Sequence, residues 1–487
     1  MLFNSYEFIF LFLPITFFIY FYLSSKRLIV GAKAFLVFAS LFFYSWWNIT
    51  YLPLILGSIL FNFTIGVSLS KDDNLKYKLS KKTILTFGII CNLLLLGYFK
   101  YTDFFISNAN LALDLNMDLL HITLPLGISF FTFTQIAYIV DAYRGEVKEM
   151  DYLNYSLFVT FFPHLLAGPI LHHKEIMPQF NHSKSFVKNY KNIAVGIFLF
   201  SIGLFKKVVI ADTFAVWATN GFDKAEVLNL IEAWATSLSY TFQLYFDFSG
   251  YTDMAIGIAL LFNIKFPINF NSPYKATNIQ DFWRRWHITL SRFLKDYIYI
   301  PLGGNKKGET RTYLNLFLTF LIGGLWHGAG WTFIFWGFLH GVALVVHRAW
   351  QKLNFKLNRI LAYFITFNFI NISWIFFRAK DWDSAIKVLS SMFSLDNVVI
   401  SKKVFDFFNS LNLNYVFNYG VVFEHLGSDN KIILFFLLFI FVLFSNNSIY
   451  IANNFKANKR NLIFILLMLI YAIPMITNIS EFLYFDF

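Results

Sequence analysis

The chain has 487 residues, of which 57% are hydrophobic, 21% aromatic and 14% charged, with a formal net charge of +12. Soluble domains carry roughly 25% charged and about 45–50% apolar residues, so this composition excludes soluble globular, disordered and fibrous proteins. The positive charge is better explained by basic cytoplasmic loops than by nucleic-acid binding. The composition therefore predicts an all-α protein that crosses the lipid bilayer several times.

Apolar runs follow one another along the chain and predict roughly 11–13 transmembrane helices, with re-entrant and interfacial helices besides. They lie at 6–24, 28–47, 50–69, 83–100, 119–141, 152–171, 193–219, 227–262, 312–346, 358–378, 431–449 and 461–478. The runs 227–262 and 312–346 are too long for one crossing, so we expect breaks around Ser249-Gly250 and Gly328-Ala329-Gly330. The polar stretch 380–430 is expected to be an extramembrane loop. Residues 1–487 are predicted to form a single membrane domain.

The distribution of charge among the short loops predicts the orientation of the chain. Basic residues concentrate after the first and third runs, at 24–33 and 71–82, whereas Asp103, Asp114 and Asp118 lie between the fourth and fifth. The positive-inside rule then places 24–33 and 71–82 in the cytoplasm and the N-terminus outside. The basic loops 184–191 and 305–311 are also expected to be cytoplasmic.

Several common catalytic motifs are missing from the sequence. There is no G-x-x-x-x-G-K-[ST] phosphate loop, no G-x-S-x-G elbow, no H-E-x-x-H pair and no His followed five residues later by an acid. The single thiol, Cys91, lies in an apolar run and can form neither an internal disulfide nor a thiolate zinc site. His164, His172 and His173 lack Cys or acidic partners at ligand spacing, so we predict no metal.

The segment FFPHLLAGPILHHKEIMPQF carries Pro163, Gly168 and Pro169, which break a helix and are compatible with a re-entrant loop. Further along, YFDFSGYTD places Asp247 and Asp253 in an apolar region. These two carboxylates either line a cavity or form buried pairs with a base such as Arg284. Both alternatives remain open from the residues alone.

The stretch from Asn278 to Asn305 has the periodicity of an amphipathic helix over residues 281–298. Asn278 is its candidate N-cap, and Pro301 with Gly303-Gly304 ends the pattern. The charged arc comprises Asp281, Arg284, Arg285, Arg292, Lys295 and Asp296. The apolar arc comprises Phe282, Trp283, Trp286, Leu290, Phe293, Leu294, Tyr297 and Ile298, with His287 among them. One interpretation is an interfacial anchor with a core histidine; the other is a cationic face that attracts the phosphates of a nucleotide-like acyl donor, above an inward-facing His287.

A second histidine, His327, lies in the apolar run LIGGLWHGAGWTFIFWGFLHG between glycines and tryptophans. Ionisable residues at membrane depth are costly and usually face a cavity or a partner. The alternative is a helix-packing motif with a hydrogen-bonded histidine, and His340 in the same run suits that structural role equally well.

Five segments in this order resemble the membrane-bound O-acyltransferase (MBOAT) family, and within it the bacterial alginate and peptidoglycan O-acetylation branch. They are PLGISFFTFTQIAYIVDAYRG, FFPHLLAGPI, YFDFSGYTDMAIGIA, DFWRRWHITLSRFLKDYIYIPLGGN and GGLWHGAGWTFIFWGFLHG. The resemblance implies a funnel-shaped helical bundle with a central tunnel, the invariant histidine at His327, and the second active-site polar residue at His287. Relatives commonly carry an Arg after the GPI segment, where this chain has His172-His173, which leaves a donor-binding role of that loop in doubt.

The resemblance implies an O-acyltransferase of the bacterial inner membrane with no bound cofactor and acetyl-CoA as the acyl donor. An extracytoplasmic polysaccharide, peptidoglycan or alginate-like, would be the acceptor, and a periplasmic O-acetyltransferase or esterase-like protein the partner. His327 and His287 are the candidate catalytic residues; Arg284, Arg285, Trp286, Trp326, Asp247 and Asp253 are candidates for the donor site or tunnel. Two alternatives are D-alanyl transfer from a carrier protein to teichoic acid and a non-enzymatic polysaccharide-precursor transporter.

Overall fold

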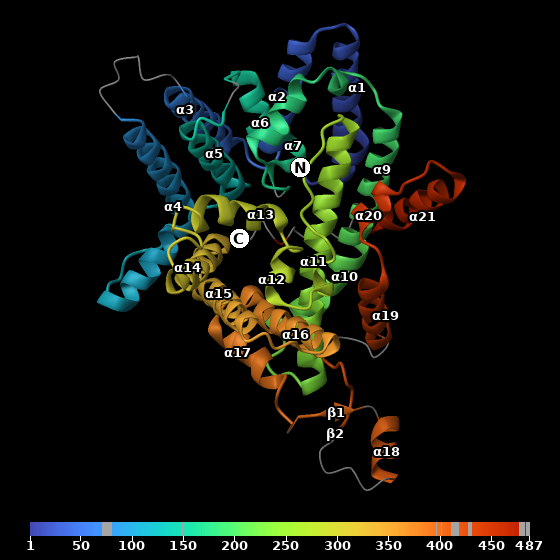
Figure 1. Ribbon diagram of the computed structural model, residues 1–487. Helices are drawn as coiled ribbons and strands as arrows, with labels where there is room; N and C mark the ends of the chain where they lie inside the picture. Colours follow the sequence, from blue (N-terminus) through green and yellow to red (C-terminus); the bar gives the residue numbers. More distant parts are fainter. Residues whose placement is uncertain are drawn as a thin grey trace. The chain divides into compact units, whose positions relative to one another are not determined.

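The computed structural model divides the chain into two compact units, each continuous in space but not in sequence. The first comprises Met1–Phe205, Gly250–Asn269 and Ala452–Phe487, and the second comprises Lys206–Ser249 and Phe270–Ile451 (Figure 1). The structure describes residues 1–70, 80–147, 150–166, 168–395, 397–400, 402–410, 418–426, 431–476 and 483. Most of the predicted basic loop 71–82 lies outside these residues. That residues 1–487 form a single domain stays a prediction.

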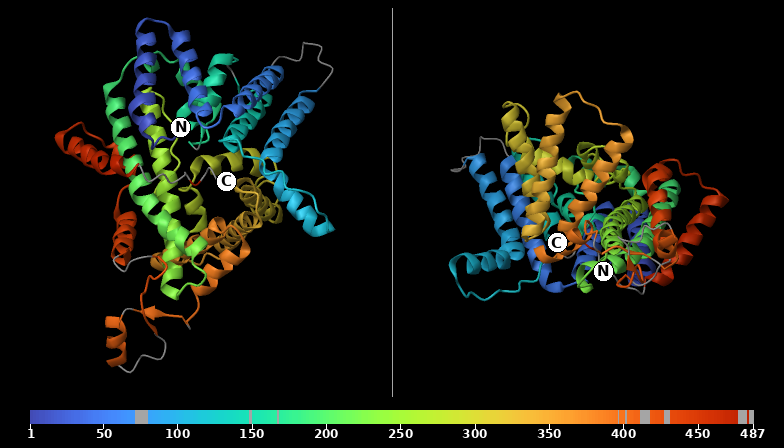
Figure 2. Two further views of the ribbon diagram at one scale, coloured as in Figure 1. Left: turned by 180° about the vertical axis from the view of Figure 1, so that it is seen from behind. Right: turned by 90° about the horizontal axis from the view of Figure 1, so that it is seen from below.

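The first unit is a helical assembly. Its helices are η1 (Glu7–Phe12), α1 (Leu13–Ser25), α2 (Ile29–Ser45), η2 (Ile49–Tyr51), α3 (Leu52–Ser70), α4 (Lys81–Leu113), α5 (Ile128–Tyr143), α6 (Tyr152–Thr160), α7 (Phe162–Leu165), α8 (His173–Ile176), η3 (Met177–Asn181), η4 (Ser183–Phe186), α9 (Tyr190–Phe205) and α21 (Lys459–Met475). Aromatic contacts hold α9 beside α21, with the rings of Phe198 and Phe464 centred 6.0 Å apart (Figures 1 and 2). The break expected around Pro163 is confirmed, because α7 is a single turn that follows α6 with a kink at Phe161.

The second unit carries both candidate catalytic histidines. Its helices are η5 (Lys206–Ala211), α10 (Asp212–Thr219), η6 (Asn220–Lys224), η7 (Pro273–Lys275), α12 (Ile279–Trp283), α13 (Ile288–Leu294), η8 (Lys295–Tyr299), α14 (Glu309–His327), α15 (Trp331–Lys352), α16 (Arg359–Arg378), α17 (Trp382–Ser391), α18 (Lys402–Ser410) and α19 (Lys431–Phe444). Two short strands, β1 (Val399–Ile400) and β2 (Asn418–Tyr419), pair in parallel. α11 (Leu230–Leu261) contributes to both units, and α20 (Ser448–Asn453) spans a boundary between them.

Six helical segments of the described chain are long and apolar enough to cross a membrane. They are Glu7–Ser25, Ile49–Ser70, Lys81–Leu113, Tyr190–Lys224, Trp331–Lys352 and Arg359–Arg378. This confirms an all-α, multi-pass membrane protein. The larger number of crossings expected from the apolar runs stays a prediction, as do the re-entrant segments and the funnel.

The expected break at Ser249-Gly250 is wrong, because α11 continues through both residues. The glycines of this region serve helix packing instead. A Cβ placed on Gly203 of α9 would lie 2.5 Å from the carbonyl oxygen of Gly250, and one placed on Gly196 would lie 2.6 Å from that of Gly257. Backbone-to-backbone approach therefore explains these small residues, as is common in membrane helices.

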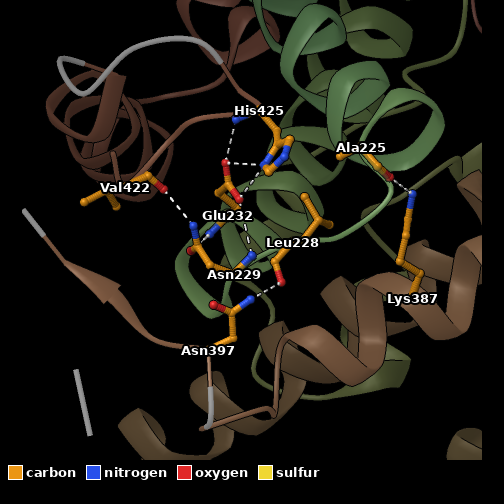
Figure 3. A network of polar contacts seen from close by, with 8 residues as sticks. All are labelled: Ala225, Leu228, Asn229, Glu232, Lys387, Asn397, Val422 and His425. Carbon is orange, nitrogen blue, oxygen red and sulfur yellow. Dashed lines mark hydrogen bonds and ion pairs between the residues drawn. The ribbon is translucent and has the colours of Figure 1, made fainter. Parts of the chain in front are cut away.

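The N-terminus of α11 is fixed by a reciprocal capping arrangement (Figure 3). The Glu232 amide donates to Asn229 Oδ1 at 3.0 Å, and the Asn229 amide donates to Glu232 Oε2 at 3.3 Å. The buried Glu232 carboxylate also accepts from the His425 amide at 2.8 Å, and Asn229 Nδ2 donates to the carbonyl of Val422 at 3.0 Å. These bonds satisfy the backbone amides of Asn229 and Glu232 at the start of α11 and anchor part of the polar 380–430 stretch to this helix.

Candidate active site

His327 is the last residue of α14, at the point where the chain reverses into α15. The break predicted at Gly328-Ala329-Gly330 is confirmed, with Gly328 and Gly330 both extended. The two helices approach very closely behind it, because a Cβ on Gly324 would lie 2.4 Å from the Phe333 carbonyl oxygen and one on Gly337 would lie 2.6 Å from that of Phe320. The glycines thus set the position of His327 at the end of a tight hairpin.

Aromatic rings surround the His327 imidazole, which is 4% exposed. The ring of Trp336 lies edge-on at 5.1 Å between centroids, that of Phe377 at 5.1 Å and that of Trp326 at 4.9 Å. Rings packed against an imidazole restrict its rotation and keep bulk water away. The predicted tunnel residue Trp326 is therefore a direct neighbour of His327.

Trp336 connects His327 to the rest of the aromatic core. Its ring stacks on Trp374 of α16 at 5.7 Å and contacts Phe377 at 5.0 Å. Trp374 in turn lies 5.0 Å from Trp286, the predicted site residue that precedes His287. Trp286 is 2% exposed. The sequence prediction found Trp286 and Trp326 but missed Trp374 and Phe377, whose apolar run carries no distinguishing motif.

His340 has the structural role that the sequence left open. The Trp283 indole donates to His340 Nδ1 at 3.2 Å, so the ring proton resides on Nε2, which donates to Ser373 Oγ at 3.0 Å. The Ser373 hydroxyl in turn donates a hydrogen bond to the carbonyl oxygen of Ile370 at 2.8 Å. Both imidazole nitrogens are thereby used within the protein, and His340 has no capacity left for substrate chemistry.

The segment that carries His287 is not one helix over 281–298. α12 ends at Trp283, α13 begins at Ile288, and η8 follows. His287 lies at the junction with φ of 42°, a left-handed conformation that is uncommon for residues other than glycine. The predicted cap is confirmed, since Asn278 Oδ1 accepts from the Asp281 amide at 2.7 Å.

The His287 side chain is fully buried, as the apolar arc predicted. Its ring packs edge-on against Phe248 of α11, with centroids 4.7 Å apart. Burial lowers the pKa of His287 from its ordinary value of 6.5 to about 3. At neutral pH the ring is therefore neutral, and it can take part in hydrogen bonds but does not act as a cation.

The charged arc of this segment faces outward as predicted. Arg284 and Lys295 are exposed, and Arg285 is partly exposed. The Arg285 guanidinium is paired with Asp281 at 2.9 Å, which offsets part of its charge. Arg284 and Lys295 are therefore the more available cations for an anionic ligand.

The two carboxylates of the apolar run 227–262 have different surroundings. Asp247 pairs with Lys207 at 2.7 Å, and the same ammonium contacts Asp212 at 2.9 Å. The base suggested from the sequence was Arg284, whereas the base that pairs with Asp247 here is Lys207, which is buried within an apolar run. Asp253 is buried in the first unit. A role for either carboxylate in a tunnel stays a prediction.

The GPI segment, in the first unit, has a partner that sequence spacing did not reveal. His173 Nδ1 lies 3.1 Å from Asp141 Oδ2 of α5, and His173 Nε2 lies 3.4 Å from the Glu146 carbonyl oxygen. His164, in the same segment, is also buried. His173 thus has an acidic partner from α5, Asp141. This contact anchors the loop rather than leaving the histidine pair exposed.

Comparison with known proteins relates this geometry to a family. The sequence model of the membrane-bound O-acyltransferase family matches residues 38–380, which include both His287 and His327. A peptidoglycan O-acetyltransferase of Helicobacter pylori is 50% identical, over 100% of this chain and 98% of its own length. A probable alginate O-acetylase, AlgI, of Pseudomonas aeruginosa is 42% identical over 82% of this chain and 76% of its own. A teichoic acid D-alanyltransferase of Bacillus subtilis is 32% identical over 52% of this chain and 69% of its own.

Proposed function

The chain belongs to the membrane-bound O-acyltransferase family, and from this premise we propose that it moves acetyl groups from cytoplasmic acetyl-CoA to hydroxyls of a polysaccharide outside the bacterial cytoplasmic membrane. The observation that carries the proposal is His327, held in an aromatic shell at the glycine break between α14 and α15. An imidazole in a water-poor setting suits proton transfer from an acceptor hydroxyl. The extended match to two kinds of O-acetylating protein supports acetate as the transferred group.

In the proposed reaction His327 acts as the general base. It accepts the proton of the acceptor hydroxyl while the oxygen attacks the thioester carbonyl carbon. The carbon–sulfur bond then breaks, its electron pair goes to sulfur, and the imidazolium returns the proton to the leaving thiolate. General base assistance of this kind contributes about 10² to 10⁴ in rate.

His287 is proposed to assist as a neutral hydrogen-bonding group. Its pKa of about 3 keeps the ring uncharged, so it suits polarisation of the thioester carbonyl or orientation of a reacting group. The nearby Arg284 and Lys295 are exposed and suit the phosphates of the donor nucleotide. In this proposal the exposed basic groups bind the donor, and the buried neutral imidazole takes part in the reaction.

The acceptor side calls for a second protein in this proposal. The hydrocarbon core of a bilayer is about 30 Å thick, so donor and acceptor pools are separated by the protein itself. We assign the final placement of the acetyl group on peptidoglycan or an alginate-like polymer to a periplasmic partner. The N-terminus and the outer loops would then face that partner.

The test is the amount of ester-linked acetate on envelope and secreted glycans of cells that carry His327→Ala or His287→Ala, compared at equal membrane levels of the protein. His121→Ala, at an exposed loop position, is the matched control. We expect both site variants to lose acetate and the control to retain it. Unchanged acetate in the His327 variant contradicts the catalytic assignment, and loss of ester-linked D-alanine instead of acetate contradicts the donor.

A further inference from the structure

A long groove runs between α15 and α16, two of the candidate membrane spans, and follows α15 from Leu339 onward, C-terminal to Trp336, which contacts His327. Its volume is about 950 Å³, and Thr277, Asn278 and Ile279 at the start of α12 are among the residues that line it. Ligand sites commonly measure roughly 300–1,000 Å³, so this groove is large enough for an extended molecule. It belongs entirely to the second unit.

The two ends of the groove differ in chemistry. One end is lined by apolar side chains, among them Leu339, Val342, Ile365 and Phe369. Phe369 lies 5.4 Å from His340 between ring centroids, which marks this end as the deep one. The lining of α15 extends from Leu339 to Gln351, which at 1.5 Å per residue is about 18 Å, close to half of a hydrocarbon core of about 30 Å. The groove therefore has the length of one leaflet.

The other end is polar and basic. Lys356 and Arg359 line it together with His347 and Gln351, and no Asp or Glu is among the lining residues. Its shape is preformed, because the Trp350 indole donates to the Phe355 carbonyl at 2.9 Å and closes the connection between the two helices. Gln351 Nε2 lies 3.1 Å from His347 Nε2 and donates a hydrogen bond to Gln280 Oε1 at 3.4 Å. Two cations without a carboxylate in the lining are complementary to an anion.

An apolar channel of one-leaflet length that ends in two cations matches an amphiphile with an anionic head. We propose that this groove binds one anionic phospholipid, with an acyl chain along the apolar end and the phosphate between Lys356 and Arg359. The acyl donor is a poorer match, because its charged nucleotide would leave the apolar end unfilled. The bound lipid would touch α12 at Ile279 and so support the element that leads to His287.

The experiment measures lipid binding to the purified full-length protein by native mass spectrometry, titrating phosphatidylglycerol against phosphatidylcholine. It needs no activity assay, so its result does not depend on the proposed acyl transfer. The double variant Lys356→Gln/Arg359→Gln removes the charge at two exposed positions. Lys306→Gln/Lys307→Gln removes equal charge from another basic loop and is the matched control. Ala362→Trp fills the groove, and Ile360→Trp, 79% exposed on the same helix, is its control.

We expect the wild type and both controls to retain one phosphatidylglycerol in preference to phosphatidylcholine. A basic residue near an anionic headgroup changes affinity by about fivefold, so the double variant should lose roughly tenfold or more. Ala362→Trp should lose binding of both lipids. Equal binding of the two lipids by the wild type, equal loss in the Lys306/Lys307 control, or displacement of phosphatidylglycerol by acetyl-CoA overturns the proposal. If Ala362→Trp does not fold, the charge variants alone decide.

Discussion

His340 and His327 belong to the same helical hairpin, yet their surroundings give them different tasks. His340 shares its two nitrogens with Trp283 and Ser373, and its tautomer is fixed by the indole donor. His327 lies at the glycine break, where its ring is bounded by aromatic edges. His340, with both nitrogens used by the fold, contributes stability, whereas His327 is the histidine for which we propose a catalytic role.

The first prediction concerns the structural histidine. His340→Ala should destabilise the folded protein by about 2–5 kcal/mol, because it leaves a cavity and removes the partner of a buried indole. The measurement is thermal unfolding in detergent, with His121→Ala as the control. An unchanged melting temperature in the His340 variant would show that the hydrogen-bonded chain contributes little.

The second prediction concerns the pH dependence caused by His287. The pKa of this buried ring is about 3, against 6.5 ordinarily, so between these values the unfolded chain binds a proton that the folded chain does not. Stability contributed by neutral His287 is therefore complete above pH 6.5 and falls on acidification toward pH 3, by at most about 1.4 kcal/mol per pH unit. Denaturant unfolding of wild type and His287→Gln across this range should show the wild type losing more stability. Parallel curves would contradict the assigned burial.

At the scale of single elements, the α14–α15 hairpin depends on two glycines in contact. The third prediction is that Gly324→Ala or Gly337→Ala separates the helices, displaces Trp336 and His327, and costs about 1–3 kcal/mol together with most of the transfer activity. Gly330→Ala is the control, because a Cβ there would meet nothing nearer than 3.5 Å and its backbone is extended. Acetate content and melting temperature report both effects. Equal behaviour of Gly324→Ala and Gly330→Ala would argue against close packing as the reason for the glycines.

The helical periodicity of residues 281–298 predicts the buried face as far as Leu294, whereas Tyr297 and Ile298 are half-buried, and it does not predict the break at His287. The faces survive because the intervening turn keeps near-helical spacing, with the Trp286 amide donating to the Phe282 carbonyl at 2.8 Å. The left-handed backbone conformation of His287 cannot be predicted from the spacing of hydrophobic residues. The opposite error occurred in α11, where a glycine that serves packing against α9 was interpreted as a break. Glycine in an apolar run has both uses, and its neighbour across the contact decides between them.

Pairings between distant segments are the part of the site that the sequence could not supply. The sequence identifies Asp247 as a carboxylate in an apolar run, but its partner Lys207 comes from another helical segment. The same holds for Asp141 with His173, and for Trp374, which joins the surroundings of the two candidate catalytic histidines. Composition and spacing identify which side chains are unusual, and the packing of helices decides which of them meet.

For the whole molecule, the apolar composition is explained by membrane spans, and the distribution of the remaining charge predicts the orientation. The fourth prediction concerns this orientation. Because Cys91 is the single cysteine, a Cys91→Ala variant has no thiol, and a cysteine introduced into it can be labelled selectively. In this background, Lys306→Cys should react with an impermeant maleimide only in inverted vesicles. Asn116→Cys, in the loop expected outside, should react only in intact spheroplasts. Both positions are exposed in the folded protein. Labelling of both from the same side would contradict the positive-inside assignment.

The central claim is that His327 carries the proton transfer in acetyl transfer across the membrane. The most direct measurement is incorporation of radiolabelled acetate from acetyl-CoA into glycan by inverted membrane vesicles that contain the protein with its natural partners. We predict that His327→Ala and His327→Gln lower the rate by about 10² to 10⁴ at unchanged protein level, as loss of a general base requires. Incorporation at the wild-type rate in either variant would contradict the account.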